Sequence, residues 1–534
     1  MSIPPRLEVG RSSEGIRLLQ RKPANVLMNS PQTCKTAAIL FVGLFACYLP
    51  LSSGSIRGQG YAGEEIDSGL RMLSVATAWM KGHPVPPMVW SRHGPVPVLF
   101  DLPFLKLGNL IVSPDFMLSF SPALFTAGLL TILFLWLRKL CSPAMSLFLV
   151  LTAAFGTMLW PYAYIGLETK QSFFILLAGY LALADGRIRT WPRLLLFATA
   201  CALAISVKGT GITLWPVIAY LIYVQFSSDW RSQRAHLLTS VLIIAAIWAF
   251  SHWGTNAYWG HLGGAGSNLR PWLIDSPIQL FSNAIGVFGS PSKGLLVYAP
   301  VLIASIYAVP RAFRTDRGLV IYALLVTACT LGFLSLLKYP TDETWGCRYM
   351  HLAIAPLVLC IGAAWPRAGW RTIAPLSVLA IVGVVVSFLG AFYYYGVHDF
   401  AMKDAGQNTA EWITGDSTWN PVQFNARLFR VWISETDNAP VLWSPKHTWV
   451  WTPPTDAPGW KSINLREYCQ PQSFMLRFWH ISKNGVVLRI FAMYVSLLVL
   501  GVLMLTWVVL RTVNEQRAES AAAFSLDAEE ARAT

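Results

Sequence analysis

Residues 372–396 read TIAPLSVLAIVGVVVSFLGAFYYYG, an uninterrupted apolar stretch without a charged side chain. A helix needs about 20 apolar residues to cross the hydrocarbon core of a bilayer, and this stretch is long enough. A helix also satisfies its own backbone hydrogen bonds, which lipid cannot do. The stretch therefore predicts a transmembrane helix.

Similar runs recur along almost the whole chain. The 534 residues are 54% hydrophobic and 13% charged, with a mean hydropathy of +0.48, which is more apolar than a soluble chain normally is. The further runs are 37–53, 118–137, 143–161, 172–185, 194–208, 211–226, 237–253, 294–310, 318–337, 350–365 and 488–510. We therefore predict an all-α polytopic membrane protein with about 12 transmembrane helices.

The charged residues predict the orientation of this bundle, because cytoplasmic loops carry an excess of Lys and Arg. Every second loop between the apolar runs is basic. The basic residues are Arg6, Arg11, Arg17, Arg21, Lys22 and Lys35 in the N-terminal tail, then Arg138/Lys139, Arg187/Arg189/Arg193, Arg231/Arg234, Arg311/Arg314/Arg317, Arg367/Arg371 and Arg511/Arg517. Both termini are therefore expected in the cytoplasm, in a multi-pass protein of the inner (plasma) membrane, with the active face extracytoplasmic.

The same pattern divides the chain into segments. We expect a cytoplasmic basic tail (1–36), a transmembrane module (37–396) with a large outer loop (53–117), an extracytoplasmic domain (397–487), a last transmembrane helix (488–510) and a cytoplasmic tail (511–534). The net charge of +14 is spread over short loops rather than gathered in one patch, so nucleic acid is not an expected partner. Of the eight cysteines, Cys347 and Cys469 are expected on the outer side, where a disulfide between them is an open question.

The first outer loop contains an acidic pair followed by a predicted helix. Ile66, Leu70, Leu73 and Met80 recur at helical spacing, which predicts an amphipathic helix in the membrane interface that ends at Gly82 and Pro84. Glu64 and Glu65 precede it. These two carboxylates have two explanations that fit equally well. They are part of a functional site, or they are solvated and stabilise the N-terminus of the helix through its dipole.

A second acid, Glu168, lies at the start of the fourth apolar run, where an unpaired carboxylate is costly. One interpretation is a functional acid, and the other is a local pair with Lys170. Lys208 and Arg348 are cations at the edges of later runs. An anionic headgroup would explain both, but Lys208 also has the length to snorkel, and Arg348 suits an interfacial anchor.

Taken together, these residues place acids and cations on one side of the membrane. Such a set suits a lipid phosphate substrate, because cations neutralise a leaving phosphate while a carboxylate removes a proton from an acceptor hydroxyl.

Several short motifs resemble the bacterial GT-C fold membrane glycosyltransferases, the superfamily of protein O-mannosyltransferases and aminoarabinose transferases. The similar segments are G-E-E at 63–65, R-H-G-P-V-P at 92–97, Glu168, V-K-G-T-G at 207–211, S-K-G-L-L-V-Y-A-P at 292–300 and W-G-C-R-Y at 345–349. They extend over about residues 60–350, most of the membrane part. The resemblance implies a GT-C-like bundle with an interfacial helix in the first outer loop and a small extracytoplasmic C-terminal domain.

The resemblance also implies roles for individual residues. Glu64 would be the catalytic base with Glu65 beside it, although the family usually has Asp-Glu here, which leaves the choice between the two open. Glu168 would be a second acid near the acceptor or near a divalent metal shared with Glu64. The donor phosphate would be held by Lys208, Arg348, Arg92 and His93.

The outer segment 397–487 is rich in tryptophan. Such rings stack on the apolar face of a sugar, but they also form the core of a small domain at the bilayer surface, which we prefer. The residues are Trp412, Trp419, Trp432, Trp443, Trp449, Trp451, Trp460 and Trp479.

The sequence as a whole predicts a glycosyltransferase that moves a sugar from a polyprenyl-phosphate-linked donor to an extracytoplasmic glycan, lipid or protein. One alternative is a transporter or flippase of a lipid-linked or anionic substrate, although neither an internal repeat nor midplane charges are apparent. The other is a polysaccharide polymerase or ligase that uses outer-loop arginines such as Arg270.

Overall fold

The structure, a computed structural model, describes most of the membrane part and portions of the rest. The described residues are 31–51, 82, 93–111, 117–118, 120–164, 166–185, 190–227, 230–261, 273–338, 345–393, 420–434, 441–443, 449–450, 461–463 and 485–533.

Each apolar run predicted from the sequence coincides with a helix or a short series of helices. These are α3 (Pro31–Tyr48), α7 (Ser121–Leu140), α8 (Pro143–Phe155), α9 (Gly166–Gly179), α10 (Trp191–Ser206), α11 (Trp215–Phe226), α12 (Arg234–His261), α15 (Ile303–Thr315), α16 (Arg317–Ser335), α17 (His351–Ala364), α18 (Trp370–Phe392) and α23 (Gly485–Ala533). Shorter elements join them: η1 (Leu49–Leu51), η2 (Pro161–Tyr164), η3 (Tyr180–Ala184), η4 (Gly209–Leu214), α13 (Pro277–Gly289), α14 (Leu295–Tyr298), η7 (Pro300–Leu302) and η8 (Arg348–Met350).

In the described part of the chain, six helical segments are long and apolar enough to cross a membrane by length and composition. They are Ser121–Leu140, Gly209–Phe226, Arg234–Ala257, Arg317–Ser335, Trp370–Phe392 and Phe491–Ala518. Shorter apolar helices occupy Gln32–Tyr48, Pro143–Phe155, Trp191–Ser206 and Arg348–Ala364. The chain is therefore a helical multi-pass membrane protein, and the total of about 12 spans stays a prediction.

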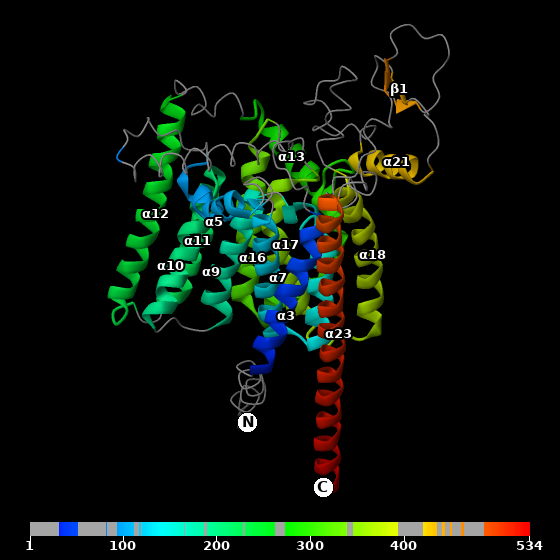
Figure 1. The fold of residues 1–534 in the computed structure, drawn as a ribbon. Helices are drawn as coiled ribbons and strands as arrows, with labels where there is room; N and C mark the ends of the chain where they lie inside the picture. Colours follow the sequence, from blue (N-terminus) through cyan, green and yellow to red (C-terminus); the bar gives the residue numbers. More distant parts are fainter. Residues whose placement is uncertain are drawn as a thin grey trace, which may run out of the picture.

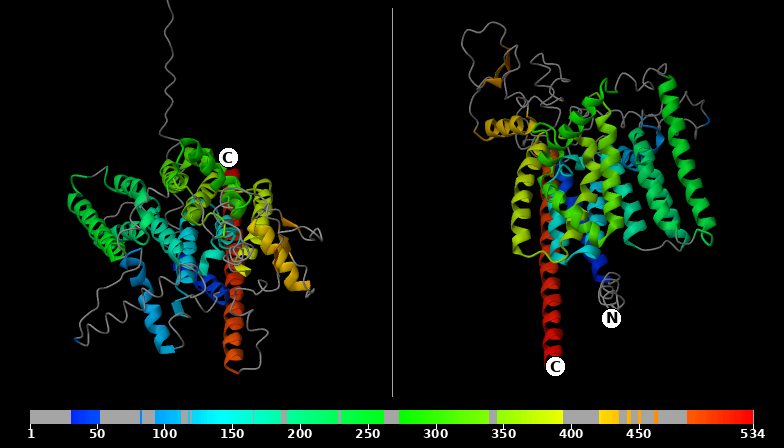
Figure 2. Two further views of the ribbon diagram at one scale, coloured as in Figure 1. Left: turned by 90° about the horizontal axis from the view of Figure 1, so that it is seen from above. Right: turned by 180° about the vertical axis from the view of Figure 1, so that it is seen from behind.

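The long helices stand side by side as one bundle (Figures 1 and 2). Successive helices run in opposite directions, so that α7, α9 and α17 begin at the upper end of Figure 1 and α8, α10 and α18 end there. We call this the site end of the bundle. Several elements lie across it, among them α5 (Pro95–Ile111) and α21 (Pro421–Ser434), and the long α23 passes the bundle at the other end.

Prolines and short polar side chains mark where the helices begin. Ser142 accepts a hydrogen bond from the backbone N–H of Met145 and is followed by Pro143, whose ring suits the first helical position of α8. Asp316 caps α16 in the same way, because its carboxylate accepts from the N–H of Leu319 at 3.0 Å. Local sequence therefore sets these boundaries without help from the bundle.

The core of the bundle contains large aromatic side chains that join neighbouring helices. Trp136 and Tyr322 are fully buried with their ring centroids 5.8 Å apart. The Tyr322 hydroxyl donates to the carbonyl of Ile175 at 2.9 Å, which ties α16 to α9. By contrast, α12, α18 and α23 expose many large apolar side chains, among them Leu242, Ile381 and Leu503. Outward apolar faces of this kind suit contact with lipid rather than water.

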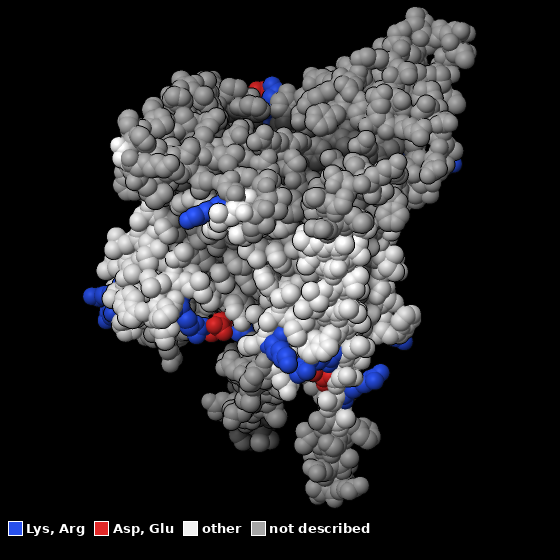
Figure 3. All heavy atoms as spheres, viewed as in Figure 1, with Lys and Arg blue, Asp and Glu red and all other residues white. Residues whose placement is uncertain are grey.

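The opposite end of the bundle carries a belt of basic residues (Figure 3). The described parts of the predicted basic loops meet there, because antiparallel neighbours bring every second loop to the same end. This arrangement agrees with the loop pattern from which the orientation was predicted, and which side faces the cytoplasm stays a prediction.

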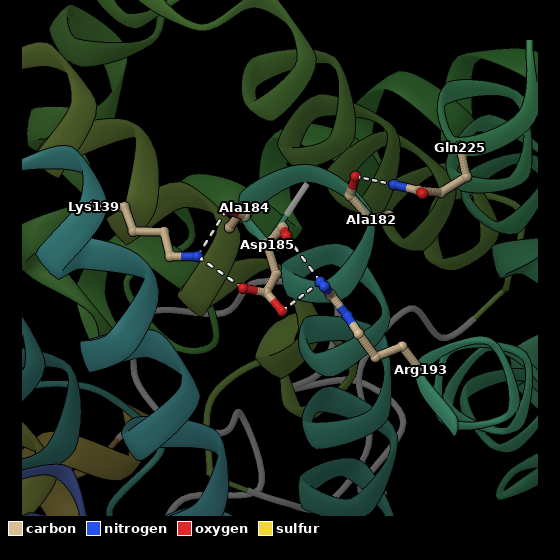
Figure 4. A network of polar contacts seen from close by, with 6 residues as sticks. All are labelled: Lys139, Ala182, Ala184, Asp185, Arg193 and Gln225. Carbon is tan, nitrogen blue, oxygen red and sulfur yellow. Dashed lines mark hydrogen bonds and ion pairs between the residues drawn. The ribbon is translucent and has the colours of Figure 1, made fainter. Parts of the chain in front are cut away.

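Within that belt, polar side chains satisfy the carbonyls at the end of η3, a π-helical turn (Figure 4). Lys139 donates to the carbonyl of Ala184 at 2.8 Å and to the Asp185 carboxylate at 3.2 Å, and Arg193 donates to the carbonyl and carboxylate of the same aspartate. Gln225 donates to the carbonyl of Ala182. These contacts fix the ends of α7, α9, α10 and α11 relative to one another, since the last carbonyls of a helix have no partner within it.

Three features differ from the segments expected from the sequence. Residues 95–111 form helix α5, although the sequence contains three prolines there. Pro95 and Pro97 lie in the first turn, where proline is tolerated, and Pro103 lies inside the helix. Helix α23 continues from the last apolar run to Ala533, and the 511–534 tail has no proline or glycine to end it.

The third difference lies in the outer segment 397–487, where the fold is not purely helical. Its described parts are α21 and three short strands, β1 (Val441–Trp443), β2 (Trp449–Val450) and β3 (Lys461–Ile463). The strands form an antiparallel sheet in the order β2-β1-β3, with Leu442 opposite Val450 and Ser462. The predicted tryptophan core of this segment lies largely outside the described residues.

Candidate functional site

The site is built from three segments that are far apart in the sequence. Glu168 lies in the first turn of α9, Lys208 follows the end of α10, and Arg348 opens the short helix η8 before α17. All three side chains are buried, with exposed fractions of 1%, 3% and 2%. Burial of three ionisable groups in one place is expensive unless they are paired or used.

The Glu168 carboxylate binds both cations through the same oxygen. Its Oε1 accepts a hydrogen bond from Nζ of Lys208 and forms an ion pair with Nε of Arg348 at 3.1 Å. Two cations and one carboxylate leave these three residues with a net charge of +1. The carboxylate thus holds two positive groups side by side that would otherwise repel each other.

Tyr349 completes this cluster from the residue after Arg348. The Lys208 ammonium lies 4.0 Å from the centroid of the Tyr349 ring, and the Arg348 guanidinium lies 5.1 Å from it. Nη2 of Arg348 also donates to the Tyr349 hydroxyl at 3.3 Å. An aromatic face stabilises a cation without neutralising its charge.

A glycine allows Lys208 to reach this position. A Cβ on Gly211 would lie 2.4 Å from the carbonyl oxygen of Ile205, which shows how closely η4 folds back on the end of α10. At Gly209, by contrast, an added Cβ would meet nothing within 4 Å.

A second buried ion pair lies on the other side of α9. Nζ of Lys170 is 2.6 Å from Oδ2 of Asp101, and the Ser121 hydroxyl donates to Oδ1 of the same aspartate at 2.7 Å. These contacts join α9 to α5 and to the start of α7. The local pair between Glu168 and Lys170, one of the two interpretations from the sequence, is therefore wrong, because residues two apart on a helix point to different sides.

A third polar contact follows one turn further along the same helix. Oγ of Ser172 and Nδ1 of His351 are 2.7 Å apart, and both residues are buried. Ser172 is four residues after Glu168 and His351 is three after Arg348, so both contacts lie between the same two segments. Sequence reasoning missed Ser172 and His351, although this spacing was visible once Glu168 and Arg348 had been singled out.

The other residues proposed from the sequence are placed differently. Glu64, Glu65, Arg92 and Arg270 lie outside the described residues, as does the predicted interfacial helix at about 66–80. Gly82, where that helix was predicted to end, has a φ of 71°, a conformation that suits glycine.

His93 is half-buried in the turn before α5. The adjacent Gly94 has a φ of 83° and packs closely on Ser251 and Thr255 of α12. Cys347 is buried, and its possible disulfide partner Cys469 lies outside the described residues.

The described residues around Glu168 do not fit a divalent metal. A metal on this carboxylate would stand beside the Lys208 ammonium and the Arg348 guanidinium, which repel it. In the part of the chain that the structure describes, no three or more His, Cys, Asp or Glu side chains gather as a metal site would require. The other predicted ligand, Glu64, is outside that part.

No protein-family model and no curated protein matches the chain. Among solved structures, it is similar to a crystal structure of ArnT from Cupriavidus metallidurans bound to undecaprenyl phosphate, with 14% identity and a TM-score of 0.44 over 93% of this chain and 78% of ArnT. The apo structure of the same ArnT gives 13% identity and a TM-score of 0.44 over 92% and 76% of the two chains.

Proposed function

We propose that this protein is a membrane glycosyltransferase that moves a sugar from a polyprenyl-phosphate-linked donor to an acceptor on the extracytoplasmic side. The observation that carries the proposal is the buried cluster of Glu168, Lys208 and Arg348 at one end of a membrane bundle. A lipid phosphate suits binding at such a cluster, because its negative charge interacts favourably with the Lys208 ammonium and the Arg348 guanidinium while its hydrocarbon chain stays in the bilayer.

The reaction follows from the charges that develop during the transfer. The acceptor hydroxyl attacks the anomeric carbon, the bond from that carbon to the phosphate oxygen breaks, and the phosphate leaves with the electron pair. Lys208 and Arg348 stabilise the charge that grows on the phosphate. A carboxylate takes the acceptor proton, and the resemblance to the superfamily assigns this role to Glu64 or Glu65.

Glu168 has a different task in this scheme. Its Oε1 already accepts from Lys208 and contacts Arg348, so its function is to hold these two cations together for the phosphate. This assignment replaces the role near the acceptor or a metal that the family resemblance implied for it. The catalytic base is therefore sought among the acids of the first outer loop.

Binding of a polyprenyl phosphate tests the proposal directly. Undecaprenyl phosphate, which is bound in one ArnT structure, is the probe, and undecaprenol, which lacks the phosphate, is its uncharged counterpart. The purified protein in lipid nanodiscs is expected to prefer the phosphate. Equal affinity for the two lipids would overturn the proposal, because the cations would then play no part in binding.

Two pairs of variants locate the effect. Lys208→Gln and Arg348→Gln are each expected to weaken binding of undecaprenyl phosphate by about 10-fold or more, since each removes a buried charge-assisted contact worth about 1.5–3 kcal/mol. Lys338→Gln and Arg311→Gln are the controls, because Lys338 is 39% exposed in a pair with Asp275 and Arg311 lies at the opposite end of the bundle. They are expected to bind like the wild type.

Turnover separates the transferase from a flippase. A transferase consumes the sugar-phosphate bond of its donor and releases the free polyprenyl phosphate, whereas a flippase returns the donor intact on the other leaflet. Glu64→Gln is expected to abolish transfer while binding of undecaprenyl phosphate persists, because the base acts only on the acceptor.

A further inference from the structure

The segment that carries Arg348 has little structure of its own. Gly346 has a φ of 63°, and η8 is a single turn of three residues. In this turn the N–H of Met350 donates to the carbonyl of Cys347 at 3.0 Å, and the N–H of His351 donates to the carbonyl of Arg348. Neither Cys347 nor Met350 caps the following turn with its side chain. The position of the Arg348 guanidinium therefore depends on contacts from other elements.

One such contact fixes the segment before Arg348. The Tyr162 hydroxyl, from η2, donates to the carbonyl of Trp345 at 2.8 Å. The Trp345 ring is buried against Tyr298, with centroids 5.1 Å apart, and against Gly390 of α18, where a Cβ would lie 2.3 Å from the indole. Trp345 is thus held by its backbone on one side and by its ring on the other.

Another contact fixes the segment after Arg348. His351 shares a hydrogen bond with Ser172 of α9, and its ring meets the Tyr162 ring edge-on with centroids 5.8 Å apart. Nε2 of His351 is buried and has no hydrogen-bond partner among the described residues, where the contact through Nδ1 orients the ring. Tyr162 therefore touches both ends of the segment, Trp345 and His351.

The hydrogen bond between Ser172 and His351 also sets the register between α9 and the segment. Glu168 and Ser172 are one turn apart on α9, and they meet Arg348 and His351, which are one turn apart on the other side. A slip of the segment along α9 would break both contacts together. The hydrogen bond between Ser172 and His351 thus keeps Arg348 aligned with Glu168.

We propose that Tyr162, Ser172 and His351 are positioning residues that clamp residues 345–351 and so hold Arg348 against Glu168. The inference deepens the proposed function, on which its ligand-binding part rests, because Arg348 is there a ligand of the donor phosphate. The clamp itself is a property of the protein without any ligand. Its two parts are therefore testable separately.

Hydrogen–deuterium exchange tests the clamp in the ligand-free protein. Tyr162→Phe and Ser172→Ala are each expected to speed the exchange of backbone amides in peptides that cover 345–351 by about fivefold, the factor that corresponds to the loss of one hydrogen bond of about 1 kcal/mol. Tyr220→Phe is the matched control, because the Tyr220 hydroxyl also donates to a backbone carbonyl of another helix, that of Gly318, at 3.0 Å. Unchanged exchange at 345–351 in both variants would overturn the clamp.

Affinity for undecaprenyl phosphate tests the action through Arg348. Tyr162→Phe is expected to weaken binding about fivefold in the wild-type background and to have no further effect in Arg348→Gln, because its influence passes through that side chain. An equal loss in both backgrounds would mean general destabilisation and would overturn the proposal. If the wild type binds no undecaprenyl phosphate, the proposed function fails while the exchange measurement still decides the clamp.

A conservative variant distinguishes a specific contact from simple packing. His351→Asn places an amide where Nδ1 of the imidazole lies and is expected to keep slow exchange at 345–351 and near-wild-type affinity. His351→Leu fills similar space without a polar atom and is expected to lose both. Equal behaviour of the two variants would show that the hydrogen bond to Ser172 has no positioning role.

Discussion

Glu168 and Lys170 are two residues apart at the start of α9, and their side chains enter different polar clusters. Glu168 faces Lys208 and Arg348, whereas Lys170 faces Asp101 and Ser121. Helix geometry imposes this separation, because a step of two residues turns the side chain by about 200° around the axis. The first turn of α9 thus contributes Glu168 to the candidate site on one face and binds α5 through Lys170 on the other.

The pair of Asp101 and Lys170 is expected to be essential for stability but replaceable as a unit. Asp101→Ala removes the carboxylate that contacts the buried Lys170 ammonium and should lower the free energy of unfolding by about 3–5 kcal/mol. Asp101→Leu combined with Lys170→Met removes both charges and should recover much of that loss. Thermal unfolding in detergent measures both, and a double variant as unstable as Asp101→Ala would contradict this account.

Gly211 is expected to be required where Gly209 is not. Gly211→Ala places a Cβ against the Ile205 carbonyl and should cost about 1–3 kcal/mol as the end of α10 shifts. Since Lys208 lies in the same turn, affinity for undecaprenyl phosphate should fall as well. Gly209→Ala is the matched control and should leave stability and affinity near the wild-type values, because an added Cβ there meets open space.

At the scale of whole elements, close helix packing depends on small residues at particular crossings. The first and last long helices, α3 and α23, pack along each other although they are at opposite ends of the chain. A Cβ on Gly501 of α23 would lie 2.9 Å from the carbonyl oxygen of Gly43 and 2.7 Å from Sγ of Cys47. Small residues let helix backbones approach closely in a membrane, where no hydrophobic force drives helices together.

A larger residue at this crossing is expected to separate the two helices. Gly501→Leu should lower the unfolding temperature in detergent, because its side chain has no space between α23 and α3. Val502→Phe adds bulk one residue further along, where the side chain is 51% exposed on the outer face, and should have little effect. Equal losses for the two variants would show that this crossing has no special role.

For the whole molecule, the arrangement of helices places different kinds of charged residues at the two ends of the bundle. The buried acid and cations of the candidate site come from α9, the link between α10 and η4, and η8, whereas Lys and Arg side chains gather at the other end on the face shown in Figure 3. If the belt faces the cytoplasm, as the loop pattern predicts, the candidate site faces outward. A donor carried by a lipid would then be used on the extracytoplasmic side.

Cysteine labelling in intact cells tests this orientation. In a background with Cys34→Ser and Cys469→Ser, a cysteine at Asp275, which is 77% exposed before α13, is expected to react with a membrane-impermeant maleimide. A cysteine at Ser232, in the link between α11 and α12 at the basic end, is expected to react only after the cells are opened. The reverse pattern would place the candidate site in the cytoplasm.

The sequence alone was sufficient for the helices and for the basic end. An apolar run is a local property, and each predicted run became a helix because lipid leaves the backbone no other partner. Local signals also placed Glu168, Lys208 and Arg348 at the edges of runs. Helix α5 and the long α23 were missed, since prolines obscured the first and the apolar pattern ended before the second.

Only the tertiary structure decided which charged residues meet. Lys208 and Glu168 are 40 residues apart, and His351 and Ser172 are 179 apart, so no local pattern pairs them. The pairing depends on which helices are neighbours and how far each is rotated, which is set by packing across the whole bundle. The sequence determined which residues are costly to bury, and the fold determined how Glu168 brings two of the cations together.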